Sequence, residues 1–268
     1  WLRKSALGFD NVEYREHTEN LAGLSLQGPT SFAVLKRLGF DALAELKPFN
    51  FIRLPFADAE LMISRTGFTG DLGYELWIDP QHALSLWDAL YEAGADYGIQ
   101  PYGEAATNMA RLEAGFLMPY MEFNEAPKTI NFGFDHTPLE LGLDWIVNFG
   151  KPHFNGRQAL LRQKREGLKR KLLKLDVEGN KTTEGSILYN NEACSHEIGY
   201  ITSAMWSPAV KANIAFAFVE TRALGGEIWA EIYHYKELRP IRKMARCTVR
   251  DKPFWIHPRT RQTPPALV

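Results

Sequence analysis

The stretch 64–78, which reads SRTGFTGDLGYELWI, constrains the fold of this chain more than any other part of the sequence. The apolar run 61–63 before it predicts a strand, and residues 74–78 alternate apolar side chains with Glu75 and Trp77, which is the period of a second strand. Three glycines lie between the two runs, and glycine adopts positive φ without a steric penalty. The sequence therefore predicts a hairpin with one apolar face and a second face that carries a carboxylate beside an indole.

The pair formed by Glu75 and Trp77 suits a flat, nitrogen-rich heterocycle as a ligand. A carboxylate can accept two parallel N–H hydrogen bonds, and an indole can stack on a ring. The alternative is a solvent-exposed Glu on the outer face of an ordinary hairpin, because carboxylates on strands usually face water. The alternation alone favours this second interpretation.

Composition places the chain among soluble globular proteins. It has 268 residues, 45% of them hydrophobic and 24% charged, and a formal net charge of −1, which gives no electrostatic reason to expect nucleic acid or an anionic membrane as a partner. Two cysteines are too few for a disulfide framework and favour a reducing compartment. No apolar run is long enough to cross a bilayer, and the seven histidines lack metal-ligand spacing. We therefore predict a cytoplasmic protein without a metal site.

Four motifs carry a resemblance to a known family. They are Thr-Gly-Phe-Thr-Gly-Asp-Leu-Gly-Tyr-Glu at 66–75, Leu-Ser-Leu-Gln-Gly-Pro at 24–29, Arg-Leu-Glu-Ala-Gly at 111–115 and Thr-Ser-Ala-Met-Trp-Ser-Pro at 202–208. On these motifs the chain resembles the glycine-cleavage T-protein family of folate-dependent aminomethyltransferases. That family also contains folate-dependent demethylases such as dimethylsulfoniopropionate demethylase. The resemblance extends over nearly the whole chain.

The resemblance implies an α+β fold of several domains around a central folate channel, with a C-terminal antiparallel β-barrel. Residues 1–46 would complete a ferredoxin-like second domain, 47–150 would form the second segment of the folate-binding catalytic domain, and 151–268 would form the barrel domain. From residue 170 onward, short strands punctuated by Gly, Asn and Pro also predict an antiparallel barrel or sandwich. The predicted strands are 172–177, 197–201, 214–219 and 227–233.

The resemblance also implies which residues bind ligands. Glu75 would hold the pterin ring of tetrahydrofolate, and Tyr74 and Arg111 would contact the same cofactor. For Arg111, a structural ion pair is an equal alternative. Trp77 and Trp206 would contact a small-molecule methyl donor, since an indole attracts sulfonium and ammonium groups. For Trp206 there is an equal alternative, in which the indole fills the junction between the barrel and the rest of the protein.

The catalytic residue is left unassigned. In the family, a long segment that carries the catalytic Asp precedes the motif found here at 24–29. This chain begins at Trp1, only a short distance before that motif. We therefore expect it to be an N-terminally truncated piece of a longer polypeptide.

One departure from the family pattern bears on the reaction. Where the glycine-cleavage enzymes have Ala-Arg-Asp, this chain has Ala106, Thr107 and Asn108, which removes a fixed positive charge. We therefore expect a demethylase that moves a one-carbon group from an S-, N- or O-methylated small molecule to tetrahydrofolate, and we do not favour a lipoyl carrier protein as its partner. The alternatives are the folate-binding portion of a flavin-dependent dimethylglycine or sarcosine dehydrogenase, and a non-catalytic folate-binding protein.

Three local predictions concern other segments. Asp79 and the following proline predict a helix start, Gly94 predicts its end, and Trp87 is expected in the core. Residues 137–147 resemble a strand of the family. The basic cluster within 164–174 is predicted to be a solvated helix end, with attraction of a folate polyglutamate tail as the alternative.

Overall fold

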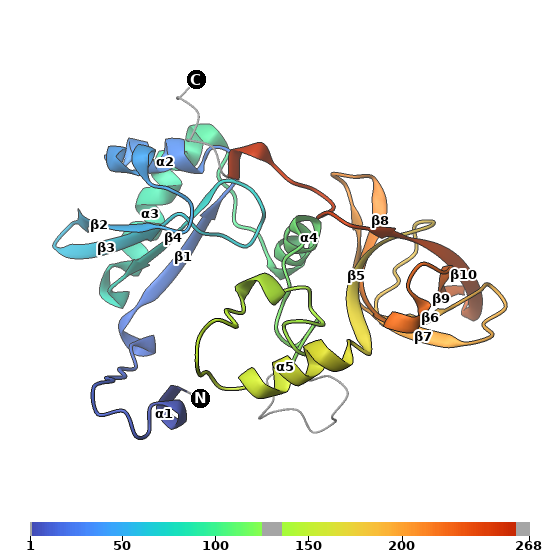
Figure 1. Ribbon diagram of the computed structural model, residues 1–268. Helices are drawn as coiled ribbons and strands as arrows, with labels where there is room; N and C mark the ends of the chain where they lie inside the picture. Colours follow the sequence, from blue (N-terminus) through green and yellow to red (C-terminus); the bar gives the residue numbers. More distant parts are fainter. Residues whose placement is uncertain (1, 125–135, 261–268) are drawn as a thin grey trace. The chain divides into compact units, whose positions relative to one another are not determined.

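The computed structural model describes residues 2–124 and 136–260. The chain divides into two compact units (Figure 1), of which unit 1 contains residues 1–107 and 256–268 and unit 2 contains residues 108–255. Helix α4 (Glu104–Ala114) begins in unit 1 and ends in unit 2. The domain boundaries expected at residues 46 and 150 stay predictions.

Unit 1 is built on a four-stranded antiparallel sheet with the strand order β1-β4-β3-β2. Its strands are β1 (Ala22–Gln27), β2 (Phe51–Phe56), β3 (Ala59–Ser64) and β4 (Gly73–Ile78). Because β3 pairs directly with β4, the predicted hairpin is confirmed. Strand β4 lies between β1 and β3, so that Glu75 is opposite Ser25 on one side and Ser64 on the other.

Helices cover the apolar face of this sheet (Figure 1). The α-helices of unit 1 are α1 (Leu2–Ser5), α2 (Ser31–Arg37) and α3 (Ala83–Gly94), and its 3-10 helices are η1 (Thr18–Asn20), η2 (Asp41–Glu45), η3 (Pro80–His82), η4 (Ala95–Tyr97) and η8 (Pro258–Thr260). Leu76 and Ile78 of β4 are completely buried in one core with Leu35 of α2 and Leu86 of α3. The alternation predicted for β4 is therefore confirmed.

Unit 2 contains a closed antiparallel barrel with the strand order β10-β5-β8-β7-β6-β9. Its strands are β5 (Arg170–Val177), β6 (Ile187–Tyr189), β7 (Glu197–Ser207), β8 (Ala212–Glu220), β9 (Ile228–Lys236) and β10 (Arg239–Arg250), and its helices besides α4 are η6 (Asp144–Ile146), α5 (Arg157–Glu166) and η7 (Thr221–Ala223). Completely buried Leu175, Ala217 and Ala230 belong to the barrel core. The predicted C-terminal antiparallel barrel is confirmed. Within residues 2–124 and 136–260, every helix is too short or too polar to cross a membrane.

The segment 137–147 is not a strand, contrary to expectation. The backbone N–H of Thr137 donates to Oε2 of Glu140 at 2.9 Å, and the backbone N–H of Glu140 donates back to Oγ1 of Thr137 at 3.4 Å. This reciprocal bonding satisfies the backbone locally and turns the chain. Gly142 continues the turn with a positive φ of 71°, and η6 follows.

Helix α3 ends at Gly94 as predicted, but it starts later than expected. Asp79 caps the 3-10 helix η3, which leads directly into α3, by accepting the backbone N–H of Gln81 at 2.9 Å. After Gly94 the chain continues as the 3-10 helix η4, which is capped by Gly98 with a left-handed φ of 66°. Gly94 is there for close packing, because a Cβ at this position would lie 2.8 Å from Cβ of Ile99. Trp87, expected in the core, is 42% exposed because it lies on the flank of the helix, and Leu86 and Leu90 supply the buried contacts.

Candidate functional site

Glu75 lies on the face of the sheet opposite the helices, and its carboxylate is held by the loop that precedes β4. Oε2 of Glu75 accepts a hydrogen bond from Oγ1 of Thr66, and Oγ of Ser64 lies 2.7 Å from that same threonine oxygen. Because a carboxylate offers about four lone-pair positions, this contact orients Glu75 and leaves it able to accept further hydrogen bonds. The side chain is half-buried.

Trp77 lies two residues further along β4 and therefore on the same face as Glu75. It is opposite Gly23 of β1 and Met62 of β3. A Cβ at Gly23 would lie 2.9 Å from Cζ3 of the indole, so the ring covers the backbone of the glycine. The indole is half-buried and lies outside the core of unit 1. The structure thus brings together the two residues that the hairpin pattern paired.

Tyr74 is on the other face of β4 and is completely buried in the core. Among the described residues its hydroxyl has no hydrogen-bond partner. Burial raises the pKa of Tyr74 to about 12, because the phenolate would lose its hydration there. Its predicted contact with the cofactor stays a prediction.

Gln27, the last residue of β1, is a site residue that the motif analysis missed. Its Nε2 lies within hydrogen-bond distance of the carbonyl oxygens of Thr66 and Tyr74, at 3.4 Å each. A Cβ at Gly67 or Gly73 would overlap the Gln27 amide, at 2.1 and 1.8 Å from its Oε1. The glycines of the loop were expected to supply positive φ, and Gly70 does so with a φ of 75°, whereas Gly67 and Gly73 do not. At these two positions a side chain would have to displace the amide of Gln27.

A cavity of about 260 Å³ lies within unit 1, beside β1 and α3. Its aromatic lining comes from Trp87, Tyr91, Tyr97 and Tyr102, and its lining also includes Ser25 and Gln27 of β1. Ser25 is directly opposite Glu75 in the strand register. The exposed ring of Trp87 is thereby explained, since it forms part of the cavity wall.

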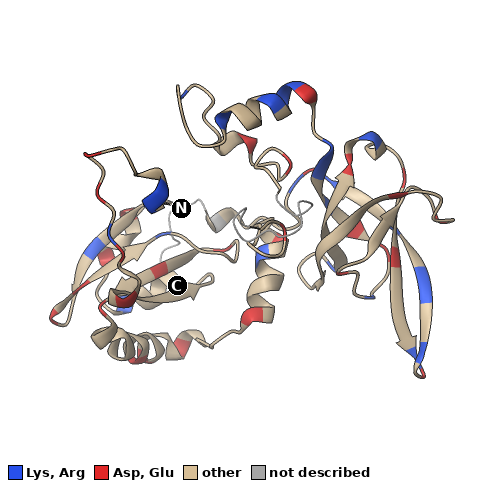
Figure 2. Ribbon diagram, turned by 90° about the horizontal axis from the view of Figure 1, so that it is seen from below, with Lys and Arg blue, Asp and Glu red and all other residues tan. Residues whose placement is uncertain are grey.

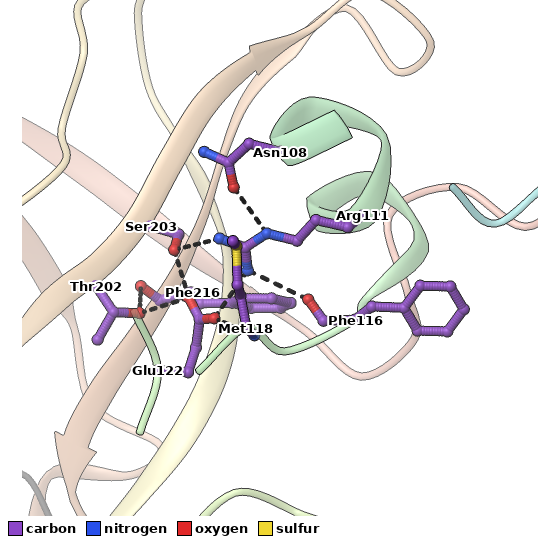
Figure 3. Close-up of polar contacts among 8 residues, drawn as sticks. All are labelled: Asn108, Arg111, Phe116, Met118, Glu122, Thr202, Ser203 and Phe216. Carbon is purple, nitrogen blue, oxygen red and sulfur yellow. Dashed lines mark hydrogen bonds and ion pairs between the residues drawn. The ribbon is translucent and has the colours of Figure 1, made fainter. Parts of the chain in front are cut away.

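Arg111, predicted to bind the cofactor, is completely buried in unit 2 and is surrounded by protein acceptors (Figure 3). Its Nε donates to Oδ1 of Asn108 at 2.7 Å, and one terminal nitrogen donates to the carbonyl of Phe116 at 3.2 Å and to Oε2 of Glu122 at 2.8 Å. The other terminal nitrogen donates to Oγ of Ser203 at 2.7 Å. The alternative of a structural ion pair is therefore confirmed, and a contact of Arg111 with a ligand stays a prediction.

Glu122 is the buried partner of Arg111 and was not identified from the sequence. Its Oε1 accepts hydrogen bonds from the hydroxyls of Thr202 and Ser203, and Oε2 accepts the backbone N–H of Met118 at 2.8 Å. The pairing of β7 with β8 shifts between Ile201 and Ser203. This bulge explains how two consecutive side chains, which alternate in a regular strand, reach one carboxylate. Burial lowers the pKa of Arg111, and the charge of Glu122 opposes that shift.

Trp206 lies on β7 opposite Asn213 and is 49% exposed. It does not belong to the cores of unit 2, and its contact with a methyl donor stays a prediction. Glu113, next to the buried arginine in α4, accepts a hydrogen bond from Oγ of Ser207 at 2.5 Å. Both charged residues of the Arg-Leu-Glu-Ala-Gly motif thus have partners on β7.

The basic cluster of 164–174 is spread over α5 and the strand that follows it (Figure 2). Lys164, Arg165 and Lys169 are exposed, as expected for a solvated helix end. Lys174 is half-buried, and loss of hydration followed by the charge of Lys171 lowers its pKa. In the described part of the chain no three His, Cys, Asp or Glu side chains gather as a metal site would require.

Family models match the chain in two segments. Residues 1–151 match the GCVT N-terminal domain, and residues 170–255 match the glycine cleavage T-protein C-terminal barrel domain. A solved structure of the glycine cleavage system aminomethyltransferase T from Bartonella henselae superposes with a TM-score of 0.77 at 28% identity, over 98% of this chain and 65% of that one.

Two curated relatives carry the name aminomethyltransferase. The protein from Caldanaerobacter subterraneus subsp. tengcongensis is 35% identical over 95% of this chain and 64% of its own length, and that from Halothermothrix orenii is 36% identical over 85% and 60%. The chain thus spans less than two thirds of the length of each of these relatives. From its matched domains, its barrel and its similarity to these proteins, the chain belongs to the glycine cleavage T-protein family.

Proposed function

We propose that this chain is part of a tetrahydrofolate-dependent one-carbon transferase that binds the reduced folate at Glu75. The observation that carries the proposal is a carboxylate on the helix-free face of the sheet, oriented by Thr66 and flanked by Trp77, in a member of this family. The names of the relatives, aminomethyltransferases, support the same reaction class.

The residues of this face fit a pterin ring. A pterin presents adjacent N–H donors in its plane, and a carboxylate is the side chain that accepts such a pair. Glu75 is half-buried, so water competes less for its oxygens than on an open surface, and the bond from Thr66 fixes the direction of one of them.

The chain's own residues would act mainly by orientation. Bound tetrahydrofolate would supply N5 as the acceptor of the one-carbon group. Glu75 would hold the ring in one orientation, and the sheet beneath it is rigid because its other face is packed against α2 and α3. Alignment of two reactants contributes up to ~7–11 kcal/mol to lowering a barrier, so such a site needs little covalent chemistry from the protein.

Two observations favour a methylated, cationic or neutral donor and hence a demethylase. Thr107 stands where the glycine-cleavage enzymes have Arg, and its hydroxyl donates to the carbonyl of Gly103 at 3.2 Å, back into its own helix. The position therefore offers no charge to an anionic substrate. Trp77, on the same face as Glu75, supplies an aromatic surface for a sulfonium or ammonium group.

The test is single-turnover transfer by the full-length protein, with tetrahydrofolate and a panel of S-, N- and O-methylated compounds. We expect formation of 5-methyltetrahydrofolate from at least one onium donor, and loss of the product in Glu75→Gln. Glu60→Gln is the matched control, because Glu60 is an exposed acid on the adjacent β3.

Three other results would each replace this proposal. Transfer only from an aminomethylated lipoyl carrier protein would indicate the glycine-cleavage reaction. A flavin spectrum in the full-length protein would indicate a dimethylglycine or sarcosine dehydrogenase. Folate binding with no turnover for any donor would indicate a binding protein.

A further inference from the structure

We propose that Gln27 is the positioning residue of the Glu75 site. Its amide is wedged between Gly67 and Gly73 and thereby fixes the loop 65–72 in the conformation that brings Thr66 to Glu75. The part of this inference that concerns ligand affinity rests on the proposed function. The part that concerns the conformation of the loop can be tested without assuming any ligand.

The steric fit is the first support. A Cβ added at Gly73 would lie 1.8 Å from Oε1 and 2.3 Å from Cδ of Gln27, and a Cβ added at Gly67 would lie 2.1 Å from the same Oε1. Neither glycine has positive φ, so the backbone itself would accept a larger residue. A side chain at either position would therefore have to displace the amide of Gln27 from its contacts.

The hydrogen bonds of the amide connect the two ends of the loop. Nε2 of Gln27 lies 3.4 Å from the carbonyl oxygen of Thr66, at the start of the loop, and 3.4 Å from that of Tyr74, just after its end. Its third contact is Oγ of Ser25, at 3.1 Å, and its Oε1 accepts from Oγ1 of Thr69 at 3.3 Å. Because Nε2 carries two N–H groups, it donates to at most two of these three acceptors at one time. Nε2 and Oε1 together use both the donor and the acceptor of the amide, which neither a carboxylate nor an apolar side chain can do.

The backbone next to Gln27 holds the same loop. The N–H of Gly28 donates to the carbonyl of Leu72 at 2.8 Å, and the hydroxyl of Ser31 reaches that carbonyl at 3.4 Å. The end of β1 is thus attached to the end of the loop by main chain, while the Gln27 side chain extends to its beginning. Nε2 thus contacts the carbonyl of Thr66 and the carbonyl of Tyr74, the residue before Glu75. The side chains of Thr66 and Glu75 bond each other.

The first test is a double-mutant cycle between Gln27→Ala and Gly73→Ala in the full-length protein, read by amide hydrogen exchange of residues 66–75. Gly73→Ala alone should speed this exchange by about tenfold or more, because its methyl group displaces the amide. In the Gln27→Ala background the same substitution should have less than about a twofold effect, because the space is vacant. Additive effects would overturn the proposal.

Gly103→Ala is the matched control. A Cβ there meets nothing within 4 Å, and φ at Gly103 is not positive, so exchange of residues 66–75 should be unchanged. If Gly73→Ala does not fold, Gly67→Ala takes its place, because it addresses the same Oε1.

The second test separates positioning from general stability by means of tetrahydrofolate affinity. Gln27→Ala and Thr66→Val should each weaken binding by about tenfold, and their combination should weaken it no more than either alone, because Gln27 acts through Thr66. If the fold-losses of affinity in the two single variants multiplied in the double variant, Gln27 would act independently of Thr66, and the positioning role would be wrong. If the wild type binds no tetrahydrofolate, the proposed function fails, and the hydrogen-exchange cycle alone decides the role of Gln27.

Discussion

Thr66 donates a hydrogen bond to Oε2 of Glu75 across the loop that joins β3 to β4. The threonine is two residues after the end of β3, whereas the glutamate is inside β4, so the bond closes the loop at its base. Ser64, 2.7 Å from the same hydroxyl, continues the contact into β3. This arrangement makes Glu75 an oriented acceptor rather than a freely rotating surface acid.

Removal of that hydroxyl should therefore weaken the site. A hydrogen bond to a charged group contributes ~1.5–3 kcal/mol, and the half-buried position of Glu75 places the expected effect at the low end. We predict that Thr66→Val weakens tetrahydrofolate binding by about tenfold, measured by calorimetry. Thr18→Val, at an exposed threonine of the same unit, should leave the affinity unchanged, and wild-type affinity in Thr66→Val would show that the contact is irrelevant to binding.

Trp77 should discriminate between donors by charge. Trp77→Leu keeps an apolar side chain over Gly23 but removes the aromatic face. A cation–π contact contributes ~0.5–2 kcal/mol, so transfer from a sulfonium or ammonium donor should fall by about 2- to 30-fold. Transfer from a neutral methylated donor should change much less. Equal losses for both donor classes, in matched kcat/KM measurements, would argue against the contact.

The buried hydroxyl of Tyr74 should make stability sensitive to alkaline pH. Burial raises the pKa of Tyr74 from its ordinary value of 10.0 to about 12, so the native state holds this proton more tightly than the unfolded state. The sign follows from that difference: the contribution of Tyr74 is fully present below pH 10 and is lost as the pH rises toward 12.

Tyr74→Phe should therefore lose less stability over this alkaline range than the wild type. At pH 7 it should be more stable by ~1 kcal/mol, because it removes a buried hydroxyl that has no partner among the described residues. Urea unfolding at pH 7 and at pH 11 measures both effects. Parallel losses in the two proteins would contradict the assignment.

The ion pair of Arg111 with Glu122 should dominate the stability of unit 2 near α4. Both side chains are 0% exposed, and removal of one partner of a buried pair leaves the other charge uncompensated, at a cost of ~3–5 kcal/mol. We predict this loss for Arg111→Met by urea unfolding, and substantial recovery in Arg111→Met combined with Glu122→Leu.

The matched control for this pair is Arg15→Met, which breaks an exposed ion pair with Glu13 whose side chains are 70% and 71% exposed. Its effect should stay below ~1 kcal/mol. If Arg111→Met also lowered the free energy of unfolding by less than ~1 kcal/mol, the other hydrogen-bond donors to Glu122 would be sufficient to stabilise its charge.

Local pattern predicted the elements of this fold well where one face is buried. The alternation in β4 assigned Leu76 to the core and Glu75 with Trp77 to the opposite face, because a strand has a side-chain period of two. The helical period did not place Trp87 correctly. One residue along a helix is enough to move a side chain from the buried face to the flank. Trp87 lines a cavity, while its neighbour Leu86 is completely buried.

Long-range contacts explain what the pattern could not predict. Gln27 reaches Gly73 only because β1 pairs with β4, with Gln27 directly opposite Gly73, and nothing local to either residue reports that register. Glu122 reaches Ser203 through a bulge in β7. Arg111 could be recognised as a motif residue, but its ion pair with Glu122 and its bond to Ser203 depend on partners outside the motif, which the local pattern does not report.

Whether Glu75 holds a reduced folate can be measured by calorimetric titration of tetrahydrofolate into the full-length protein, its Glu75→Gln variant and the Glu60→Gln control. Gln keeps the size of the side chain but replaces one acceptor with a donor. We predict binding to the wild type and to Glu60→Gln, with affinity about tenfold or more weaker in Glu75→Gln. Equal affinity of Glu75→Gln and wild type, or no binding to the wild type, would contradict this prediction.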